Sequence, residues 1–291
     1  MRVNTKGPLL IAATAVLWSF AGILIKLVPW DAMTIVGIRA LIAGVVMAIY
    51  MRRPHITFSP AVILGGLSLA ATTMLFVYAN KLTTAANAIV LQYVAPIFVL
   101  IMSALFFKKR FRPFDIIAVV VVFFGIALFF FDKLQATAVL GNILALLAGV
   151  AFAGVFMINQ MKGAKPEEAL LLGHIINLVV SIPFIATHVT FEPLPWLYIT
   201  LLGVFQLGLA YVLFSKGIKL TPPVAASLIC TIEPLLNPVW VLLLTGEKPG
   251  VFALIGGAVV LVTVVAYSIK ASKQPVSSLP VSDEKPPVNN L

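Results

Sequence analysis

The residue of this sequence most suited to chemistry is a carboxylate inside an apolar stretch. Glu233 stands in LICTIEPLLNPVW, directly before Pro234. Ionisable groups are costly in apolar surroundings, and those that occur there commonly relay protons or pair with a cation. Because proline removes a backbone donor, the carboxyl could instead stabilise an interrupted helix. A role in coupling or gating and a purely structural role both stay open.

Arg39, in TIVGIRALIAG, is a second ionisable residue within apolar sequence. A guanidinium can hold a carboxylate through two parallel hydrogen bonds, so Arg39 could bind an acidic group of a small molecule. It could equally neutralise Glu233 inside the protein. The choice depends on whether the two segments meet, which the sequence does not tell.

Aromatic and polar side chains within the apolar runs can together form a pocket that combines ring faces with a few hydrogen-bonding groups. With Arg39, the expected lining of this substrate cavity is Trp18, Tyr78, Gln92, Tyr93, His174, Gln206 and Tyr211. Each of these alone is more often a contact between helices. The single cysteine, Cys230, has no CxxC or CxxH neighbour, so we expect no metal site and no cofactor.

The elements that must position these residues are membrane-spanning helices. Hydrophobic residues make up 61% of the chain and charged residues only 10%, against about one quarter charged in soluble domains. Apolar segments near the ~20 residues needed to cross a bilayer recur throughout. The ten expected spans are about 8–28, 32–51, 61–80, 84–107, 113–131, 139–160, 168–187, 195–215, 222–244 and 249–270.

Positive charge predicts the orientation of these spans. The net charge of +10 comes without a basic stripe interleaved with aromatics, which excludes a nucleic-acid module. On one side lie Arg2, Lys6, Arg52, Arg53, Lys108, Lys109, Arg110, Arg112, Lys162, Lys165, Lys216, Lys219, Lys270, Lys273 and Lys285, and on the other Lys26, Lys81, Lys133 and Lys248. Lys and Arg are retained on the cytoplasmic side. We therefore expect a multi-pass protein of the inner or plasma membrane with both termini in the cytoplasm.

An internal repeat divides the chain. A shift of 138 residues aligns NKLTTAANAIVLQYVAPIFV (80–99) with IKLTPPVAASLICTIEPLLN (218–237). We expect residues 1–135 and 136–270 to be two five-helix repeats, followed by a disordered cytoplasmic tail over 271–291. Because five is odd, equivalent helices enter from opposite faces, which predicts the inverted repeat of many secondary transporters around a central cavity.

Two prolines occupy equivalent places in this repeat. Pro96 aligns with Pro234, which predicts two bent helices at equivalent depths. Bent helices near the midplane expose backbone polar groups to a cavity, where inverted-repeat transporters bind cargo. Proline is also ordinary in membrane helices, where neighbouring side chains satisfy the freed groups. The paired placement favours a role for both prolines in gating.

Several segments carry a resemblance to a known family. They are AVLWSFAGILIK (15–26), Arg39, residues 86–128 and residues 225–262, with Glu-Pro at 233–234 and Gly-Glu-Lys at 246–248. The chain resembles the drug/metabolite transporter superfamily, specifically its ten-helix branch with two EamA-type repeats. The resemblance implies alternating access and small-molecule cargo, frequently amino acids and often exported. Aromatic-amino-acid exporters are the relatives most similar in character.

The first repeat departs from the family pattern. Ala95 precedes Pro96 where the second repeat has Glu233, and Lys108-Lys109-Arg110 occupies the place of Gly246-Glu247-Lys248. A symmetric pair of carboxylates is therefore excluded. Four positions match the family pattern: Trp18, Arg39, Glu233 and Glu247. The resemblance implies that they serve the shared fold or gating more than the choice of cargo.

The leading hypothesis is a secondary transporter that exports amino acids or similar metabolites across the lipid bilayer, as a monomer or weak homodimer. An exporter of drugs or other organic solutes is the alternative within this class. A channel would show a continuous polar stripe or charged ring, which the sequence lacks. An intramembrane enzyme would need clustered catalytic residues, and neither HExxH nor GxSxG occurs, so we expect no enzymatic activity.

Overall fold

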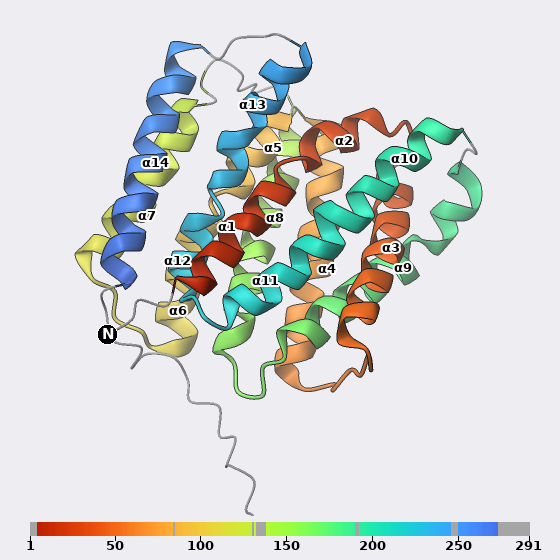
Figure 1. Cartoon of the computed structure of the whole chain (residues 1–291), viewed down its shortest axis with the longest axis horizontal. Coiled ribbons are helices and arrows are strands. Elements are labelled where there is room, and N and C mark those ends of the chain that lie inside the picture. The colour runs from red at the N-terminus through yellow and green to blue at the C-terminus, as the bar shows by residue number, and fades with distance from the viewer. Residues whose placement is uncertain are drawn as a thin grey trace, which may run out of the picture.

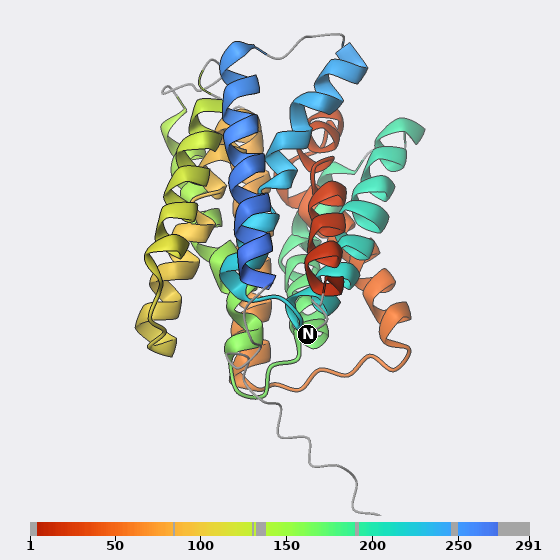
Figure 2. The same ribbon diagram turned by 60° about the vertical axis from the view of Figure 1, so that its left-hand side comes forward.

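The computed structural model describes residues 5–83, 85–129, 131, 138–189, 192–245 and 250–272. Within these ranges all regular secondary structure is helical. The long helices run alongside one another as a bundle (Figures 1 and 2). Lys133, the segment Gly246-Glu247-Lys248 and the predicted tail from residue 273 lie outside the described residues.

Among the residues that the structure describes, seven helical segments are long and apolar enough to cross a membrane. They are Lys6–Leu27, Ala32–Met51, Pro60–Leu82, Asn87–Phe107, Val139–Gln160, Pro166–Ile185 and Pro193–Ile218. Shorter apolar helices, in three further predicted spans, are Pro113–Leu128, Pro223–Leu236 and Leu254–Tyr267. The all-helical, multi-pass character agrees with the sequence, and the number of ten spans stays a prediction.

Individual helices are shorter than the spans because several spans are interrupted. In chain order they are α1 (Lys6–Trp18), α2 (Ala21–Leu27), α3 (Ala32–Met51), α4 (Pro60–Leu82), α5 (Ala85–Gln92), α6 (Ala95–Phe107), α7 (Pro113–Phe129), α8 (Val139–Met157), η2 (Ile158–Gln160), α9 (Pro166–His188), α10 (Pro193–Leu201), η3 (Leu202–Leu209), α11 (Ala210–Ile218), α12 (Pro223–Ile229), α13 (Ile232–Thr245) and α14 (Val251–Ser272). The segment η3 is π-helical, a form that often marks functional sites.

The packing of the bundle pairs helices that are distant in sequence. At one edge α7 lies beside α14, and at the other α3 lies beside α9 (Figure 1). Between them α4 packs on α8, and α1 packs on α11. The interrupted helix α12–α13 rests against α1, whereas the interrupted helix α5–α6 rests against α8. The helices around the centre therefore come from all parts of the chain.

Ion pairs join the turns at one end of the bundle, which we call the basic end. Lys219 Nζ lies 2.5 Å from Glu167 Oε1, and Lys165 Nζ lies 3.0 Å from Glu168 Oε1. Lys165 also donates a 2.8 Å hydrogen bond to Thr57 Oγ1. These contacts connect turns that enter and leave α3, α4, α9 and α11, so they hold this end together.

Two lysines close the opposite end in another way. Lys81 Nζ donates to the carbonyl of Val28 at 2.8 Å, and Lys26 Nζ donates to the carbonyl of Thr83 at 3.2 Å. Trp30 meets Trp196 edge to face, with ring centroids 5.4 Å apart. Both lysines described at this end are thus hydrogen-bonded to backbone carbonyls.

Candidate functional site

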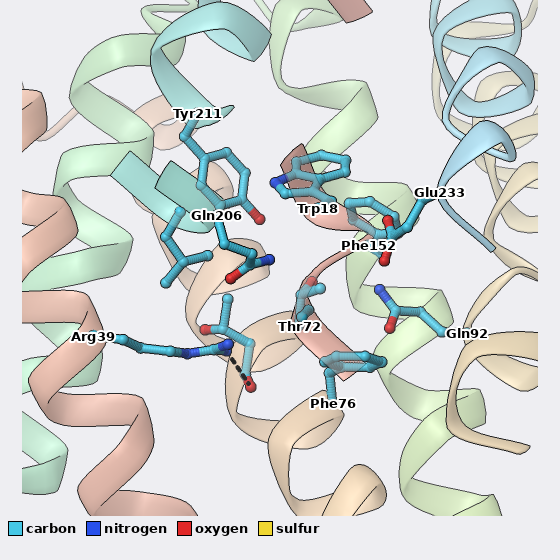
Figure 3. Close-up of a pocket in the computed structure, with 12 residues that line it drawn as sticks. Trp18, Arg39, Thr72, Phe76, Gln92, Phe152, Gln206, Tyr211 and Glu233 are labelled. Atoms are coloured by element: carbon cyan, nitrogen blue, oxygen red, sulfur yellow. Dashed lines mark hydrogen bonds between the residues drawn. The ribbon is translucent and has the colours of Figure 1, made fainter. Parts of the chain in front are cut away.

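A small cavity lies inside the bundle where the interrupted helices meet (Figure 3). Its lining comes from α1, α2, α3, α4, α5, α8, η3, α11 and α13: Trp18, Ala21, Arg39, Thr72, Thr73, Phe76, Gln92, Phe152, Gln206, Leu207, Tyr211 and Glu233. Its volume of about 30 Å³ suffices for a few water molecules. Pockets that hold small molecules are typically ~300–1,000 Å³. The cavity in this conformation is therefore too small for a metabolite.

Arg39 enters the cavity from α3 and is the largest fully buried side chain. One of its terminal nitrogens, Nη2, donates to the carbonyl of Thr73 at 3.4 Å. Its Nε has no hydrogen-bond partner among the residues that the structure describes. No carboxylate in the described part of the chain lies within 4.0 Å of the guanidinium, so Arg39 is a buried cation without a counter-ion.

Aromatic rings form a continuous wall of the cavity. The Trp18 ring lies 5.2 Å from Tyr211 and 5.4 Å from Phe152, measured between centroids. These separations lie within the range in which ring pairs attract one another. His174 stands behind this wall, with its ring 5.6 Å from Tyr211 in a T-shaped contact. The wall offers a cargo flat apolar faces beside the buried guanidinium.

Glu233 enters from α13, on the opposite side of the cavity from Arg39 (Figure 3). Its Oε2 lies 2.7 Å from the hydroxyl oxygen of Tyr93. The same hydroxyl donates to the carbonyl of Cys230 at 2.6 Å. Arg39 and Glu233 thus share the cavity without forming an ion pair among the described residues.

The two aligned prolines lie directly after the two interruptions. The α5–α6 helix is broken at Tyr93 and Val94, and Pro96 stands in the first turn of α6. The α12–α13 helix is broken at residues 230 and 231, and Pro234 stands in the first turn of α13. Since proline has no N–H, the carbonyls four residues earlier lose their helical partners. Each break therefore leaves one backbone carbonyl, that of Gln92 or that of Cys230, without its helical donor.

The sequence-predicted site residues divide into three groups. Those that line the cavity are Trp18, Arg39, Gln92, Gln206, Tyr211 and Glu233. Tyr93 and His174 lie one contact behind the lining, against Glu233 and Tyr211 respectively. Tyr78, on α4, is half-buried and is not among the lining residues.

Several lining residues were not singled out as cavity residues in the sequence. They are Thr72, Thr73 and Phe76 on α4, Phe152 on α8, and Ala21 and Leu207. Ala21 and Phe152 belong to two Phe-Ala-Gly motifs, at residues 20–22 and 152–154, and this recurrence near the start of each half is a usable signal. The break between α1 and α2, at Ser19 and Phe20, could not be predicted from a proline, because no proline lies next to it. Among the described residues, no group of three His, Cys, Asp or Glu side chains could hold a metal ion.

Comparison with known proteins identifies the family. The model of the EamA-like transporter family matches twice, over residues 5–131 and over residues 139–269. The chain belongs to the EamA-like transporter family. It is therefore a membrane transporter of the drug/metabolite transporter superfamily.

Relatives of this EamA-like protein agree with that assignment. An uncharacterized transporter of Archaeoglobus fulgidus is 24% identical over 94% of this chain and 99% of its own length. A second from the same organism is 25% identical over 88% of this chain and 93% of its own length. An uncharacterized transporter of Bacillus subtilis, YxxF, is 22% identical over 60% of this chain, and the match spans 58% of that protein.

A solved crystal structure shares the fold of this family member. It superposes with a TM-score of 0.77 at 16% sequence identity, and the match covers 92% of this chain and 98% of that structure. At this identity the likeness concerns the fold alone.

Proposed function

We propose that this chain is a secondary transporter for small organic solutes with a carboxylate group, such as amino acids, and that Arg39 binds the carboxylate. The observation that carries the proposal is the buried guanidinium without a counter-ion inside an aromatic-lined cavity. An unpaired buried cation is costly, and a carboxylate from the cargo would supply two charge-assisted hydrogen bonds. Trp18, Phe152 and Tyr211 would pack against the apolar part of the cargo, as in an aromatic-amino-acid exporter.

The small size of the cavity supports transport by alternating access. A space of about 30 Å³ cannot admit an amino acid unless the surrounding helices move apart. The contacts between helices support two inverted repeats, 1–135 and 136–270, because they recur when the repeats are exchanged. The pair α4 and α8 corresponds to α11 and α1, and the pair α5–α6 with α8 corresponds to α12–α13 with α1. Such symmetry offers two conformations that open to opposite sides.

Orientation and direction are part of the proposal. The lysines and acids of the basic end would lie in the cytoplasm, which agrees with the preference of Lys and Arg for that side. In this orientation both termini are cytoplasmic, and the carrier exports cargo across the inner membrane. Glu233 is the coupling group in this scheme, and Pro96 and Pro234 place the gating bends.

Flux in proteoliposomes tests the proposed cargo. Vesicles that contain the purified protein are loaded in turn with each of the twenty labelled amino acids, and efflux is compared with that of empty vesicles. We expect efflux for at least one amino acid. Arg39→Gln should lower the apparent affinity for that cargo by about 30-fold or more, since truncating one partner of a buried charge pair costs about 2–5 kcal/mol.

The matched control is Arg53→Gln, which removes an equal charge from an exposed turn. It should leave efflux unchanged. Absence of efflux for all twenty amino acids would refute an amino-acid cargo. An Arg39→Gln protein with unaltered affinity would refute the anchoring role of the guanidinium.

A further inference from the structure

The hydroxyl of Tyr93 has one proton and two short contacts. Its oxygen lies 2.6 Å from the carbonyl oxygen of Cys230 and 2.7 Å from Glu233 Oε2. Both distances are typical of strong O–H···O hydrogen bonds. A backbone carbonyl can only accept, and an ionised carboxylate can only accept. One tyrosine proton cannot serve two acceptors at such distances, so a second proton is needed.

A proton on Glu233 supplies that second bond. The protonated carboxyl donates from Oε2 to the Tyr93 oxygen, and Tyr93 in turn donates to the Cys230 carbonyl. The Cys230 oxygen also accepts the backbone N–H of Glu233 at 2.9 Å. In this series of hydrogen bonds every short contact has one donor and one acceptor. Buried polar groups are normally satisfied in this way.

The surroundings of Glu233 agree with a neutral carboxyl. The titratable or charged groups that face it are Tyr93 from the α5–α6 break, Cys230 from the end of α12, Tyr211 from α11 and Arg39 from α3. His174 on α9 lies behind Tyr211. No cation among the described residues lies within 4.0 Å of its oxygens, and a buried carboxylate without a partner is costly.

We infer that Glu233 holds a proton in this conformation, and that release of this proton transfers the Tyr93 hydroxyl from the Cys230 carbonyl to the Glu233 carboxylate. The step is a proton transfer: the Oε2–H bond breaks, its electron pair stays on the carboxylate, and the proton forms a new O–H bond with a water molecule in the cavity. The O–H group of Tyr93 then rotates toward the new negative charge, and its hydrogen bond to the Cys230 carbonyl is lost. No other covalent bond forms or breaks.

This rotation acts on the backbone of the break. Pro234 cannot donate to the Cys230 carbonyl because it has no N–H, so Tyr93 replaces the missing helical hydrogen bond. Proton release removes that replacement and leaves the break between α12 and α13 less constrained. Tyr93 is thus a positioning residue that links the protonation of Glu233 to the geometry of the α12–α13 helix. The inference deepens the proposed transport function, and it specifies proton exchange at Glu233 as the coupling event.

Infrared spectroscopy of the purified protein tests the inference without any cargo. At neutral pH the wild-type spectrum should contain the carbonyl stretch of a protonated carboxylic acid, and this band should be lost in Glu233→Gln. The control Glu168→Gln removes an ion-paired carboxylate at the basic end and should leave the band in place. If the wild-type protein and Glu233→Gln have the same spectrum in this region, the inference is wrong.

A second variant tests the part played by Tyr93. Tyr93→Phe removes one oxygen atom and should shift the acid band in frequency, because the carboxyl loses its acceptor. Tyr198→Phe, a half-buried tyrosine on α10 away from the cavity, should leave the band unmoved. An unshifted band in a folded Tyr93→Phe protein would overturn the link. If Tyr93→Phe does not fold, the wild-type protein with isotopically labelled tyrosine can be used instead. Its infrared spectrum shows whether a tyrosine C–O stretch changes when the acid band disappears. An unchanged stretch would also overturn the link between Tyr93 and Glu233.

Transport measurements separate this inference from the proposed cargo. In Glu233→Gln and Tyr93→Phe, flux driven by a pH gradient should fall to the level of empty vesicles, whereas exchange of labelled for unlabelled cargo should persist. Retention of gradient-driven flux in both would refute proton coupling while leaving the carboxylate cargo intact. If no cargo is found, the proposed cargo is refuted, and the infrared experiment, which uses no cargo, still tests the protonation of Glu233.

Discussion

The two interrupted helices have a proline at the same place, and the surroundings of the freed carbonyl differ between them. At the break before Pro96 the freed oxygen belongs to Gln92, and the backbone of Gly149 on α8 lies so close that a methyl group there would be 2.7 Å from it. At the break before Pro234 the freed oxygen belongs to Cys230, and it accepts the Tyr93 hydroxyl. The first break is closed by packing, and the second by a titratable pair.

This difference explains why only one repeat has the acid. Position 95 is a fully packed alanine, 1% exposed, so the first break has no space for a carboxyl. Position 233 has a hydrogen-bond partner for its carboxyl, because the first break supplies Tyr93 to the second. The first break therefore acts as a fixed support, and a change of protonation is confined to the second.

The largest effect is expected when the second break is copied into the first. Ala95→Glu would bury a carboxyl without a donor, and an uncompensated buried charge costs about 3–5 kcal/mol. We expect loss of the monodisperse peak in detergent and a strongly lowered midpoint of thermal unfolding. Ala95→Gln has nearly the same size without the charge and should be milder. A stable Ala95→Glu protein would show that the first break is not a closed support.

A smaller effect should follow when the close approach of Gly149 is disturbed. Gly149→Ala places a methyl group against the Gln92 oxygen and a Val94 methyl, and overpacking of this kind costs about 1–3 kcal/mol. Scanning fluorimetry should report a lower unfolding temperature. The matched control is Gly44→Ala, whose added methyl would meet only the His174 Cβ, at 3.6 Å. Equal stability of the two variants would contradict closure by packing.

The hydroxyl of Tyr93 should contribute less to stability than this packing. Tyr93→Phe leaves the Cys230 oxygen with the Glu233 N–H as its one donor and leaves the protonated Glu233 carboxyl without its acceptor. A lost buried partner costs roughly 1–2 kcal/mol. The midpoint of thermal unfolding at neutral pH should fall modestly. Tyr211→Phe, which loses a hydroxyl without a hydrogen bond to Glu233 among the described contacts, is the comparison. A larger loss in Tyr211→Phe would argue against the special role of Tyr93.

The smallest effect concerns the prolines themselves. Pro234→Ala restores an N–H that can reach the Cys230 oxygen. Tyr93→Phe should therefore lower the stability less in the Pro234→Ala background than in the wild type. We expect a coupling of about 0.5–1 kcal/mol in the double-mutant cycle. Pro96→Ala should show no such coupling with Tyr93→Phe. Both coupling energies are measured by thermal unfolding. Equal coupling energies in the two cycles would show that both breaks are closed in the same way.

Much of the fold could be predicted because its signals are local. The predicted span 32–51 coincides with α3, and the predicted span 61–80 lies within Pro60–Leu82. Apolar length determines the spans, and the aligned prolines mark two of the breaks. These features need no knowledge of which helices are neighbours.

The cavity was harder to predict because its members come from distant helices. A membrane helix is apolar toward lipid and toward its neighbours alike, so its sequence does not reveal which face is inward. Tyr78 and Phe76 show the result: two residues apart on α4, only Phe76 lines the cavity. The π-helical turn that carries Gln206 had no sequence signal either. Only the packing of α3 and α13 around the cavity brings Arg39 and Glu233 into its lining.

Each broken helix rests on a helix from the other half of the chain, α12–α13 on α1 and α5–α6 on α8. A five-helix segment by itself would leave its broken helix without the neighbour that covers it, so we expect neither half to fold without the other. The two halves nevertheless differ at aligned positions, as Glu233 and Ala95 do.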